Sequence, residues 1–301
     1  MHGQFSRLPV VLLTGASTGL GLATAHALAS QACRVALTAR AESLPRLAAA
    51  GLRESDRLLF RPLDVVERRQ RETVVSELTD RWGGIDVLIN NAGIAYRAVV
   101  EHWDPNAWRN IMEVDVVAAL DLTRLVLPGM RTRRSGRILN VSSVGGMMAM
   151  PTMSLYSAAK FALEGATESL WYEVRPWGIW VSLIEPGFIR SDSFRNTRFT
   201  QRSFSAAMDG DDPYHAHYLH MAQFIERMME RAVATPERVA RRILRTLRQR
   251  RPPLRVYATP DAHLFALLRR LLPRGLYHGI LYRALPHISA WGHENGKPPL
   301  A

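Results

Sequence analysis

The stretch "LTGASTGLG" at residues 13–21 decides the fold, because it places three glycines between an apolar run and a helix-length segment. The apolar run "PVVLLT" at residues 9–14 predicts a buried strand. Gly15, Gly19 and Gly21 would let the backbone turn tightly and approach a pyrophosphate, which then meets the free N–H groups of the helix N-terminus. Such a turn is also an ordinary strand-to-helix connection, but its position directly after the first strand favours dinucleotide binding.

Apolar strands and amphipathic helices alternate along most of the 301 residues, which is the pattern of βαβ units on a parallel sheet. Strands are expected near residues 9–14, 33–39, 58–63, 85–90, 136–142, 179–185 and 254–258. Helices are expected near residues 19–30, 41–50, 67–82, 104–131, 154–177 and 236–250. The sequence therefore predicts a doubly wound α/β (Rossmann) fold, with a mostly parallel seven-stranded sheet and helices on both faces.

Two parts of the chain are distinguished by composition. Residues 1–259 are interpreted as one dinucleotide-binding catalytic domain, with a substrate-loop insertion at about 190–231, and residues 260–301 as an amphipathic, arginine-rich tail. Cys33 is the only cysteine, which excludes a disulfide framework and favours a reducing, cytoplasmic location. No secretory signal is expected from the opening residues, and no apolar run reaches the roughly 20 residues that span a bilayer.

The formal net charge of +12 is concentrated toward the C-terminus, because residues 231–283 contain thirteen arginines and two acidic residues. The helix near residues 236–250 is expected to bury its apolar face against the sheet. Two interpretations of the tail stay open: association with an anionic membrane surface, or a cover over the substrate pocket or a partner subunit. Nucleic-acid binding is not expected, since no aromatic-interleaved basic groove is present.

Further motifs follow the glycine loop: "LDV" (63–65), "NNAG" (90–93), "SSVGG" (142–146), "YSAAK" (156–160) and "PGFIRS" (186–191). In this order and spacing the chain resembles the short-chain dehydrogenase/reductase family, and within it most the hydroxysteroid and retinol dehydrogenases. The resemblance implies a nicotinamide-dependent oxidoreductase without a metal. It assigns cofactor binding to Gly15, Ser17, Thr18, Gly19, Leu20, Gly21, Arg40, Asp64, Val65, Asn91, Ala92, Gly93, Tyr156, Lys160, Pro186, Gly187, Ile189 and Ser191.

Lys160 is notable because the chain has only one other lysine, Lys297. It stands four residues after Tyr156, so a helix would place both on one face. A fixed ammonium nearby favours the phenolate of a tyrosine, and its compact head can also reach ribose hydroxyls. The resemblance makes Tyr156 the general acid in carbonyl reduction and the base in alcohol oxidation.

Two further residues complete the catalytic set that the resemblance implies. Ser143 stands thirteen residues before Tyr156 and would hydrogen-bond the substrate oxygen; Ser142 is the alternative one position earlier. Asp115, in "MEVDVVAA", occupies the place of an asparagine that belongs to the family's proton relay. Aspartate keeps an acceptor, loses the amide donor and adds a charge, so an altered relay is expected.

The end of the second strand bears on the choice of cofactor. An acidic residue there would bind the ribose 2′-hydroxyl of NAD, but the strand ends in "LTAR". The guanidinium of Arg40 can pair with a 2′-phosphate, so NADP(H) is preferred over NAD(H); Arg40 could also simply cap an exposed turn.

Methionines and aromatic residues dot the segment at 145–153 and the insertion at 190–231. Because such side chains form adaptable apolar linings, a bulky hydrophobic alcohol, ketone or aldehyde is the expected substrate. A homodimer or homotetramer is expected through the helices near 104–131 and 154–177. Two other functions stay open: a nucleotide-binding scaffold or sensor without turnover, and a membrane-surface protein that acts through its basic tail.

Overall fold

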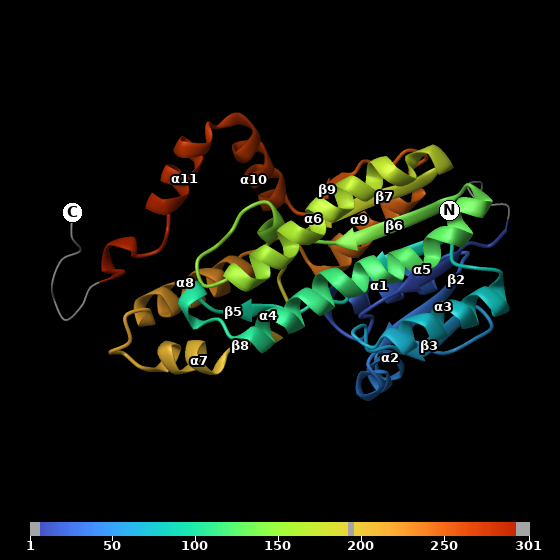
Figure 1. The fold of residues 1–301 in the computed structure, drawn as a ribbon, viewed down its shortest axis with the longest axis horizontal. Coiled ribbons are helices and arrows are strands. Elements are labelled where there is room, and N and C mark those ends of the chain that lie inside the picture. Colours follow the sequence, from blue (N-terminus) through green and yellow to red (C-terminus); the bar gives the residue numbers. More distant parts are fainter. Residues whose placement is uncertain (1–6, 192–195, 293–301) are drawn as a thin grey trace.

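The computed structural model describes residues 7–191 and 196–292 as an α/β fold (Figure 1). The strands are β1 (Val10–Leu13), β2 (Arg34–Ala39), β3 (Leu58–Pro62), β4 (Val87–Asn90), β5 (Tyr96–Arg97), β6 (Gly136–Val141), β7 (Ile179–Glu185), β8 (Arg198–Phe199) and β9 (Arg255–Tyr257). The helices are α1 (Gly19–Ala29), α2 (Pro45–Ala49), α3 (Arg68–Trp82), α4 (Pro105–Met112), α5 (Ala118–Arg133), α6 (Ser154–Val174), α7 (Gln201–Met208), α8 (His215–Glu230), α9 (Pro236–Arg248), α10 (Pro260–Leu271) and α11 (Arg274–Arg283).

Seven strands form one sheet in the order β3-β2-β1-β4-β6-β7-β9, and each neighbouring pair is parallel. The predicted doubly wound sheet is therefore confirmed. The chain leaves β1 toward β2 and β3 on one side, then returns to β4 and continues outward on the other side. Such a reversal opens a crevice at the carboxyl ends of the two central strands, here β1 and β4.

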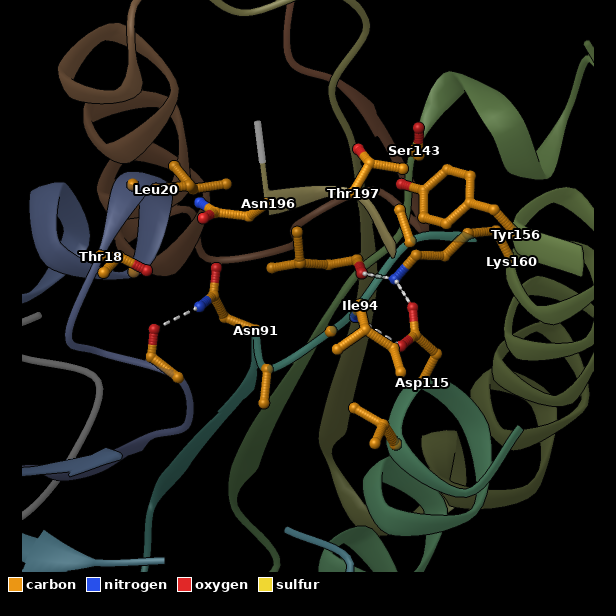
Figure 2. A pocket seen from close by; sticks show the side chains of 18 of the residues that line it. Thr18, Leu20, Asn91, Ile94, Asp115, Ser143, Tyr156, Lys160, Asn196 and Thr197 are labelled. Atoms are coloured by element: carbon orange, nitrogen blue, oxygen red, sulfur yellow. Dashed lines mark hydrogen bonds and ion pairs between the residues drawn. The ribbon is translucent and has the colours of Figure 1, made fainter. Parts of the chain in front are cut away.

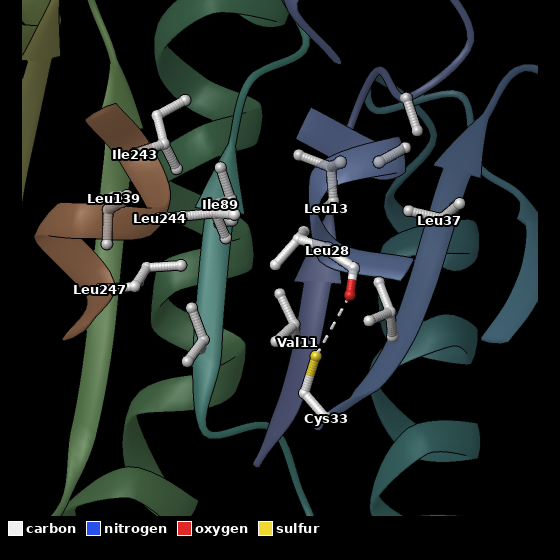
Figure 3. Packing of buried hydrophobic residues seen from close by; sticks show 14 of the residues in the cluster. Val11, Leu13, Leu28, Cys33, Leu37, Ile89, Leu139, Ile243, Leu244 and Leu247 are labelled. Carbon is white, nitrogen blue, oxygen red and sulfur yellow. Dashed lines mark hydrogen bonds between the residues drawn. The ribbon is translucent and has the colours of Figure 1, made fainter. Parts of the chain in front are cut away.

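Alternating side chains of the central strands pack into two apolar layers, one on each face of the sheet. Val11 and Leu13 point to a cluster with α1 and α9, whereas Val10 and Leu12 point to a cluster with α3, α5 and α6. This alternation follows from the two-residue period of a strand. Figure 3 shows the first cluster, in which Leu244 and its neighbours on α9 reach the sheet. The predicted burial of Val239, Ile243 and Leu247 on α9 is confirmed, since all three are fully buried.

The lone cysteine belongs to the same apolar layer. Cys33 is buried, its Sγ lies 3.7 Å from the carbonyl oxygen of Leu28, and burial raises the pKa of the thiol to about 11. Because the thiolate is the reactive form of cysteine, the raised pKa and the burial favour a packing role for this side chain.

The helix expected at 104–131 is not continuous α-helix. A π-helical segment, Glu113–Val117, separates α4 from α5. The helix expected at 41–50 consists of a short 3₁₀ turn followed by α2. The insertion at 190–231 contains two helices, α7 and α8, and β8 pairs with β5 in a small second sheet. The sequence did not indicate these elements.

The tail contains α10 and α11, which stand off from the sheet at one end of the molecule (Figure 1). The last nine residues of the predicted tail, 293–301, and residues 192–195 of the insertion lie outside the described residues. Among the helices of the described part, none is long and apolar enough to cross a membrane.

Candidate active site

A pocket of about 800 Å³ lies at the carboxyl ends of the strands. Its lining includes each of the predicted catalytic and cofactor-binding residues except Ser191. The Ser191 hydroxyl lies 3.5 Å from the carbonyl oxygen of Ile189, which does line the pocket. Figure 2 shows Thr18 and Leu20 on one side of the view and Ser143 and Tyr156 on the other. One cavity therefore joins the glycine loop to the expected reacting groups.

The glycine loop has the geometry that a pyrophosphate needs. Gly15 and Gly19 have φ values of +65° and +52°, which lie in the left-handed region that favours glycine. A Cβ on Gly21 would lie 1.9 Å from the carbonyl oxygen of Gly15, so the close packing of helix and loop excludes any side chain there. Thr18 precedes α1 and makes no side-chain cap. The first N–H groups of α1 are thus free to bind an anion.

Asn91 and Thr14 hold the two central strand ends together. The Asn91 Nδ2 donates to the carbonyl oxygens of Thr14 and Gly15 at 3.0 and 3.1 Å. In return, the backbone N–H groups of Asn91 and Ala92 donate to the Thr14 hydroxyl, each at 3.0 Å. The "NNAG" motif therefore fixes the position of the glycine loop, in addition to lining the pocket.

Lys160 and Asp115 form a buried ion pair in the lining of the pocket. Lys160 Nζ lies 2.9 Å from Asp115 Oδ2 and donates to the carbonyl oxygen of Val141 at 3.2 Å. The second carboxylate oxygen accepts the N–H of Ile94 at 2.8 Å. Asp115 belongs to the π-helical segment, and these contacts tie α6, the π-helical segment, the end of β6 and the segment after β4 to one another (Figure 2).

Burial acts on both charges of this pair. It raises the pKa of Asp115, against the opposing effects of Lys160 and of the Ile94 N–H. Burial by itself would lower the pKa of Lys160, but the Asp115 carboxylate together with Tyr156 and Glu164 outweighs burial, so the lysine pKa is raised. Lys160 therefore keeps its proton, and a fixed positive charge lies 5.7 Å from the centre of the Tyr156 ring.

Tyr156 and Ser143 meet across a glycine. A Cβ built on Gly145 would lie 2.9 Å from Cε1 of Tyr156 and 3.5 Å from the Ser143 hydroxyl. The Gly145 N–H donates to that hydroxyl at 3.0 Å, which orients the serine after β6. In the sequence, Gly145 is only one position of the "SSVGG" motif; the close approach to the tyrosine ring gives the reason for the glycine.

A buried polar cluster lies behind the serine loop and was not foreseen. Ser142, the alternative to Ser143, donates to Glu164 at 2.7 Å, so its hydroxyl is engaged away from the reacting groups. Arg255 on β9 pairs with both Glu164 and the fully buried Glu185. Burial, together with the charge of Glu164, raises the pKa of Glu185 to about 8. Glu168 lies 3.3 Å from the same guanidinium, so three carboxyl groups share Arg255, and Glu164 and Glu185 are the buried ones.

The loop after β7 is held by the start of the tail. The Gly187 N–H donates to the Thr259 hydroxyl at 2.8 Å, and the Phe188 N–H donates to Asp261 at 2.7 Å. The Asp261 carboxylate can approach this closely because residue 187 is glycine: a Cβ there would lie 1.9 Å from the carboxylate. The first turn of α10 therefore positions a loop that lines the pocket.

Arg40 lies at the outer rim of the nucleotide side. Its guanidinium forms an exposed ion pair with Glu42 at 3.1 Å. Ser43 and Arg46 also line the pocket and were not predicted, because they lie beyond the strand end and outside any motif. Two arginines are thus available at the place where a ribose would lie.

The substrate side is lined largely by apolar residues. Met150 and Met153 come from the predicted methionine segment, whereas Phe188, Ile225 and Met229 come from the β7 loop and α8. Met208, by contrast, is 70% exposed and lines nothing. Polar residues of this lining that the sequence did not indicate include Asn110, Asn196, Thr197 and Arg198; no motif surrounds the last three.

A model of the short chain dehydrogenase family matches residues 9–202. The chain belongs to the short-chain dehydrogenase family. "Oxidoreductase BOA17" of Botryotinia fuckeliana is 34% identical over 84% of this chain and 90% of its own length. Human "17-beta-hydroxysteroid dehydrogenase type 1" is 34% identical, and the match covers 83% of this chain and 77% of that protein. Family membership and these relatives support oxidoreductase activity on this scaffold.

Solved structures show the same fold. A short-chain dehydrogenase from Streptomyces avermitilis has a TM-score of 0.76 and 31% identity, and the match covers 93% of this chain and 95% of that one. A short-chain dehydrogenase of Burkholderia cenocepacia in complex with NADP matches 93% of this chain and 98% of its own, with a TM-score of 0.70 and 23% identity. A homologue of Burkholderia phymatum in complex with NAD has a TM-score of 0.72 and 22% identity, over 98% of both chains.

Proposed function

We propose that the protein is an NADP(H)-dependent oxidoreductase that interconverts a bulky hydrophobic ketone or aldehyde and its alcohol. The observation that carries the proposal is the joint placement of Tyr156, Lys160 and Ser143 in one pocket with the glycine loop. A phenol beside a fixed ammonium and a positioned hydroxyl is an arrangement suited to moving a proton at a carbonyl oxygen.

The residues present fit a nicotinamide dinucleotide. The uncapped start of α1 and the positive φ values of Gly15 and Gly19 provide a cradle for the pyrophosphate. Asp64 and Val65 line the pocket next to the glycine loop, on the side expected for the adenine. Arg40 and Arg46 at the rim favour the 2′-phosphate of NADP(H) over the free hydroxyl of NAD(H). When bound, the nicotinamide would supply or accept the hydride at the carbonyl carbon.

The protein's own residues would manage the proton. In reduction, Tyr156 donates its phenolic proton to the oxygen as the carbonyl carbon gains the hydride; in oxidation, the phenolate takes the hydroxyl proton. The ammonium of Lys160 stabilises the phenolate, and Asp115 keeps that ammonium in place. Ser143 donates a hydrogen bond to the substrate oxygen and so stabilises its developing charge.

The apolar lining supports a hydrophobic substrate. Met150, Met153, Phe188, Ile225 and Met229 line the pocket together with the reacting groups, and thioether and aromatic side chains adapt to bulky apolar ligands. The names of two similar proteins are in keeping with this substrate class. One is the human hydroxysteroid dehydrogenase, and the other is a "3-ketodihydrosphingosine reductase" of Bacteroides thetaiotaomicron, which is 32% identical to this chain.

Homo-oligomerisation through the α4–α5 region (104–131) and α6 stays a prediction. Phe161 and Tyr172 on α6 are 38% and 64% exposed, and exposed aromatic side chains are common in subunit interfaces.

The test compares turnover with nucleotide binding. The purified full chain is assayed for NADPH oxidation with steroid and long-chain ketones, beside Tyr156→Phe and, as a matched control on the same helix, Tyr172→Phe. We expect Tyr156→Phe to lose activity by about 10²-fold or more while NADPH binding, measured by calorimetry, is retained. Tyr172 is 64% exposed, so its variant should match the wild type. Nucleotide binding without turnover of any carbonyl would favour a non-catalytic scaffold.

A further inference from the structure

The hairpin formed by α10 and α11, residues 260–283, exposes an apolar stripe. Leu264, Leu267 and Leu271 on α10 are 53%, 52% and 67% exposed, respectively. Their spacing of three and four residues places them on one face of the helix. On α11, Leu276 and Ile280, four residues apart, are also exposed. The hairpin lies away from the sheet in Figure 1, so this stripe belongs to a projecting part of the molecule.

The opposite face of the hairpin already has a partner within the chain. Phe265, Leu268 and Leu272 pack against a cluster that contains Met147 and Met148 of the segment after Ser143. The hairpin is therefore anchored from inside, and the outward leucines do not hold it in place. Contiguous apolar side chains that folding leaves in water usually mark a binding surface.

The charge of the hairpin is of one sign. Residues 262–292 contain four arginines, Arg269, Arg270, Arg274 and Arg283, and no aspartate or glutamate. Arg270 is exposed and lies beside Leu267 and Leu271 on the helix surface, and Arg283 is exposed one turn after Ile280. The only acid of the hairpin, Asp261, is engaged with the Phe188 N–H inside the fold.

We propose that this hairpin docks on an anionic lipid bilayer, with the leucine stripe in the interface and the arginines against the headgroups. Exposed leucines bracketed by arginine, in a stretch of residues 262–292 without aspartate or glutamate, are complementary to such a surface. A second copy of the chain fits less well, because a two-fold contact through this stripe would bring the arginines of both hairpins together. The inner face rests on the segment that contributes Met150 to the pocket, so docking would place the pocket close to a lipid phase.

Vesicle sedimentation tests the proposal on the full chain. We expect binding to vesicles of phosphatidylcholine with phosphatidylserine, at least about tenfold weaker binding to phosphatidylcholine alone, and weakening by salt. The double variant Leu267→Glu/Leu271→Glu should lose binding to the anionic vesicles by about tenfold or more. The matched control is Phe204→Glu/Met208→Glu, which places the same charges at exposed apolar positions on α7 and should bind like the wild type.

Two further measurements make the outcome decisive. Thermal unfolding should be the same for both double variants, since all four side chains are exposed, so lost binding cannot come from misfolding. Light scattering reports the mass of each variant in solution. Equal sedimentation of wild type and Leu267→Glu/Leu271→Glu would overturn the proposal. A second result would also overturn it: the wild type does not bind vesicles but forms an oligomer, and Leu267→Glu/Leu271→Glu dissociates that oligomer. This result would assign the stripe to contact with a second copy of the chain. None of these readouts depends on catalytic activity.

Discussion

Asp115 Oδ2 lies 2.9 Å from Lys160 Nζ, and both side chains are almost completely buried. The family pattern that the sequence resembles has an asparagine in the place of Asp115. In this chain a carboxylate from the π-helical segment contacts the lysine directly, while its other oxygen accepts the Ile94 N–H. The substitution therefore adds a charge that fixes Lys160 beside the phenol, so an intact charge at Asp115 is expected to matter for stability.

Asp115→Ala should be strongly destabilising, because it leaves the buried ammonium of Lys160 without its counter-charge. Loss of one partner of a buried ion pair typically costs about 3–5 kcal/mol. Asp115→Asn should cost less, because an amide oxygen can still accept the Ile94 N–H. Urea denaturation of the ligand-free protein measures both values.

The matched control for this pair is Asp56→Asn, at an exposed position, where a change within about 0.5 kcal/mol is expected. Equal stabilities of wild type and Asp115→Ala would show that the ion pair contributes nothing net. A double variant Asp115→Ala/Lys160→Met, which removes both charges, should recover part of the loss.

The fold was predictable because its signals are local. The glycine loop, the apolar strand runs and the amphipathic face of α9 each follow from residues close in sequence. The π-helical segment was missed for a physical reason: its residues have ordinary helical composition, and one widened turn leaves the apolar periodicity nearly unchanged. Helix α8 was missed because histidines and charges interrupt its apolar face.

Site residues that belong to a sequence motif could be predicted. Site residues that reach the pocket only through tertiary contacts could not. Tyr156, Lys160 and Ser143 stand in motifs, and the structure brings them to one pocket. The contact of Asp261 with the Phe188 N–H joins the tail to a loop 73 residues earlier, and nothing in either segment indicates it. Thr197 and Arg198 reach the pocket through the pairing of β8 with β5. Strands of two residues are too short to leave a recognisable pattern in the sequence, so this pairing could not be predicted.

Gly145→Ala should reduce turnover more than it reduces stability. The new Cβ would lie 2.9 Å from Cε1 of Tyr156, so the ring must shift, and a small displacement of a reacting group can cost about 10²-fold in rate. Steady-state kinetics with the carbonyl identified for the wild type gives kcat and KM. Nucleotide affinity serves as the check that the pocket is otherwise intact.

Gly165→Ala is the matched control for Gly145→Ala. Gly165 lies within α6, and an added Cβ there meets nothing within 4 Å. Alanine in place of a helical glycine should stabilise by about 0.5–1 kcal/mol and leave kcat unchanged. If Gly145→Ala turned over like Gly165→Ala, the close contact with Tyr156 would have no role in positioning the ring.

Glu185→Gln should flatten the dependence of stability on pH between weakly acidic and weakly basic solution. Burial and the neighbouring Glu164 raise the pKa of Glu185 from 4.5 to about 8. A raised carboxyl pKa means that the folded state binds more protons than the unfolded state in this window. Its contribution is fully present below pH 4.5 and is lost as the pH rises through about 8.

Melting temperatures of wild type and Glu185→Gln across this range test the assignment. The wild type should lose stability relative to the variant as the pH increases, since glutamine stays neutral throughout. Parallel curves for the two proteins would mean that Glu185 titrates near its ordinary pKa, with Arg255 and the carboxylates holding full charges.

Arg40→Ala should reduce the preference for NADPH over NADH. The Arg40 guanidinium lies at the pocket rim and forms an exposed pair with Glu42 at 3.1 Å, which is a weak interaction that a phosphate can replace. Loss of a charge-assisted contact should weaken NADPH binding by about tenfold or more, with little effect on NADH. Calorimetric titrations with both nucleotides measure the ratio.

Arg46→Ala and Arg69→Ala sharpen this comparison. Arg46 lines the same rim and should weaken NADPH binding further when combined with Arg40→Ala, whereas Arg69 is exposed on α3 away from the lining and should bind like the wild type. An unchanged NADPH preference in the double variant Arg40→Ala/Arg46→Ala would remove the basis for assigning NADP(H). Because Glu42 would then be the remaining charged side chain of the Arg40–Glu42 pair, the ribose 2′-hydroxyl of NAD(H) would become its expected partner.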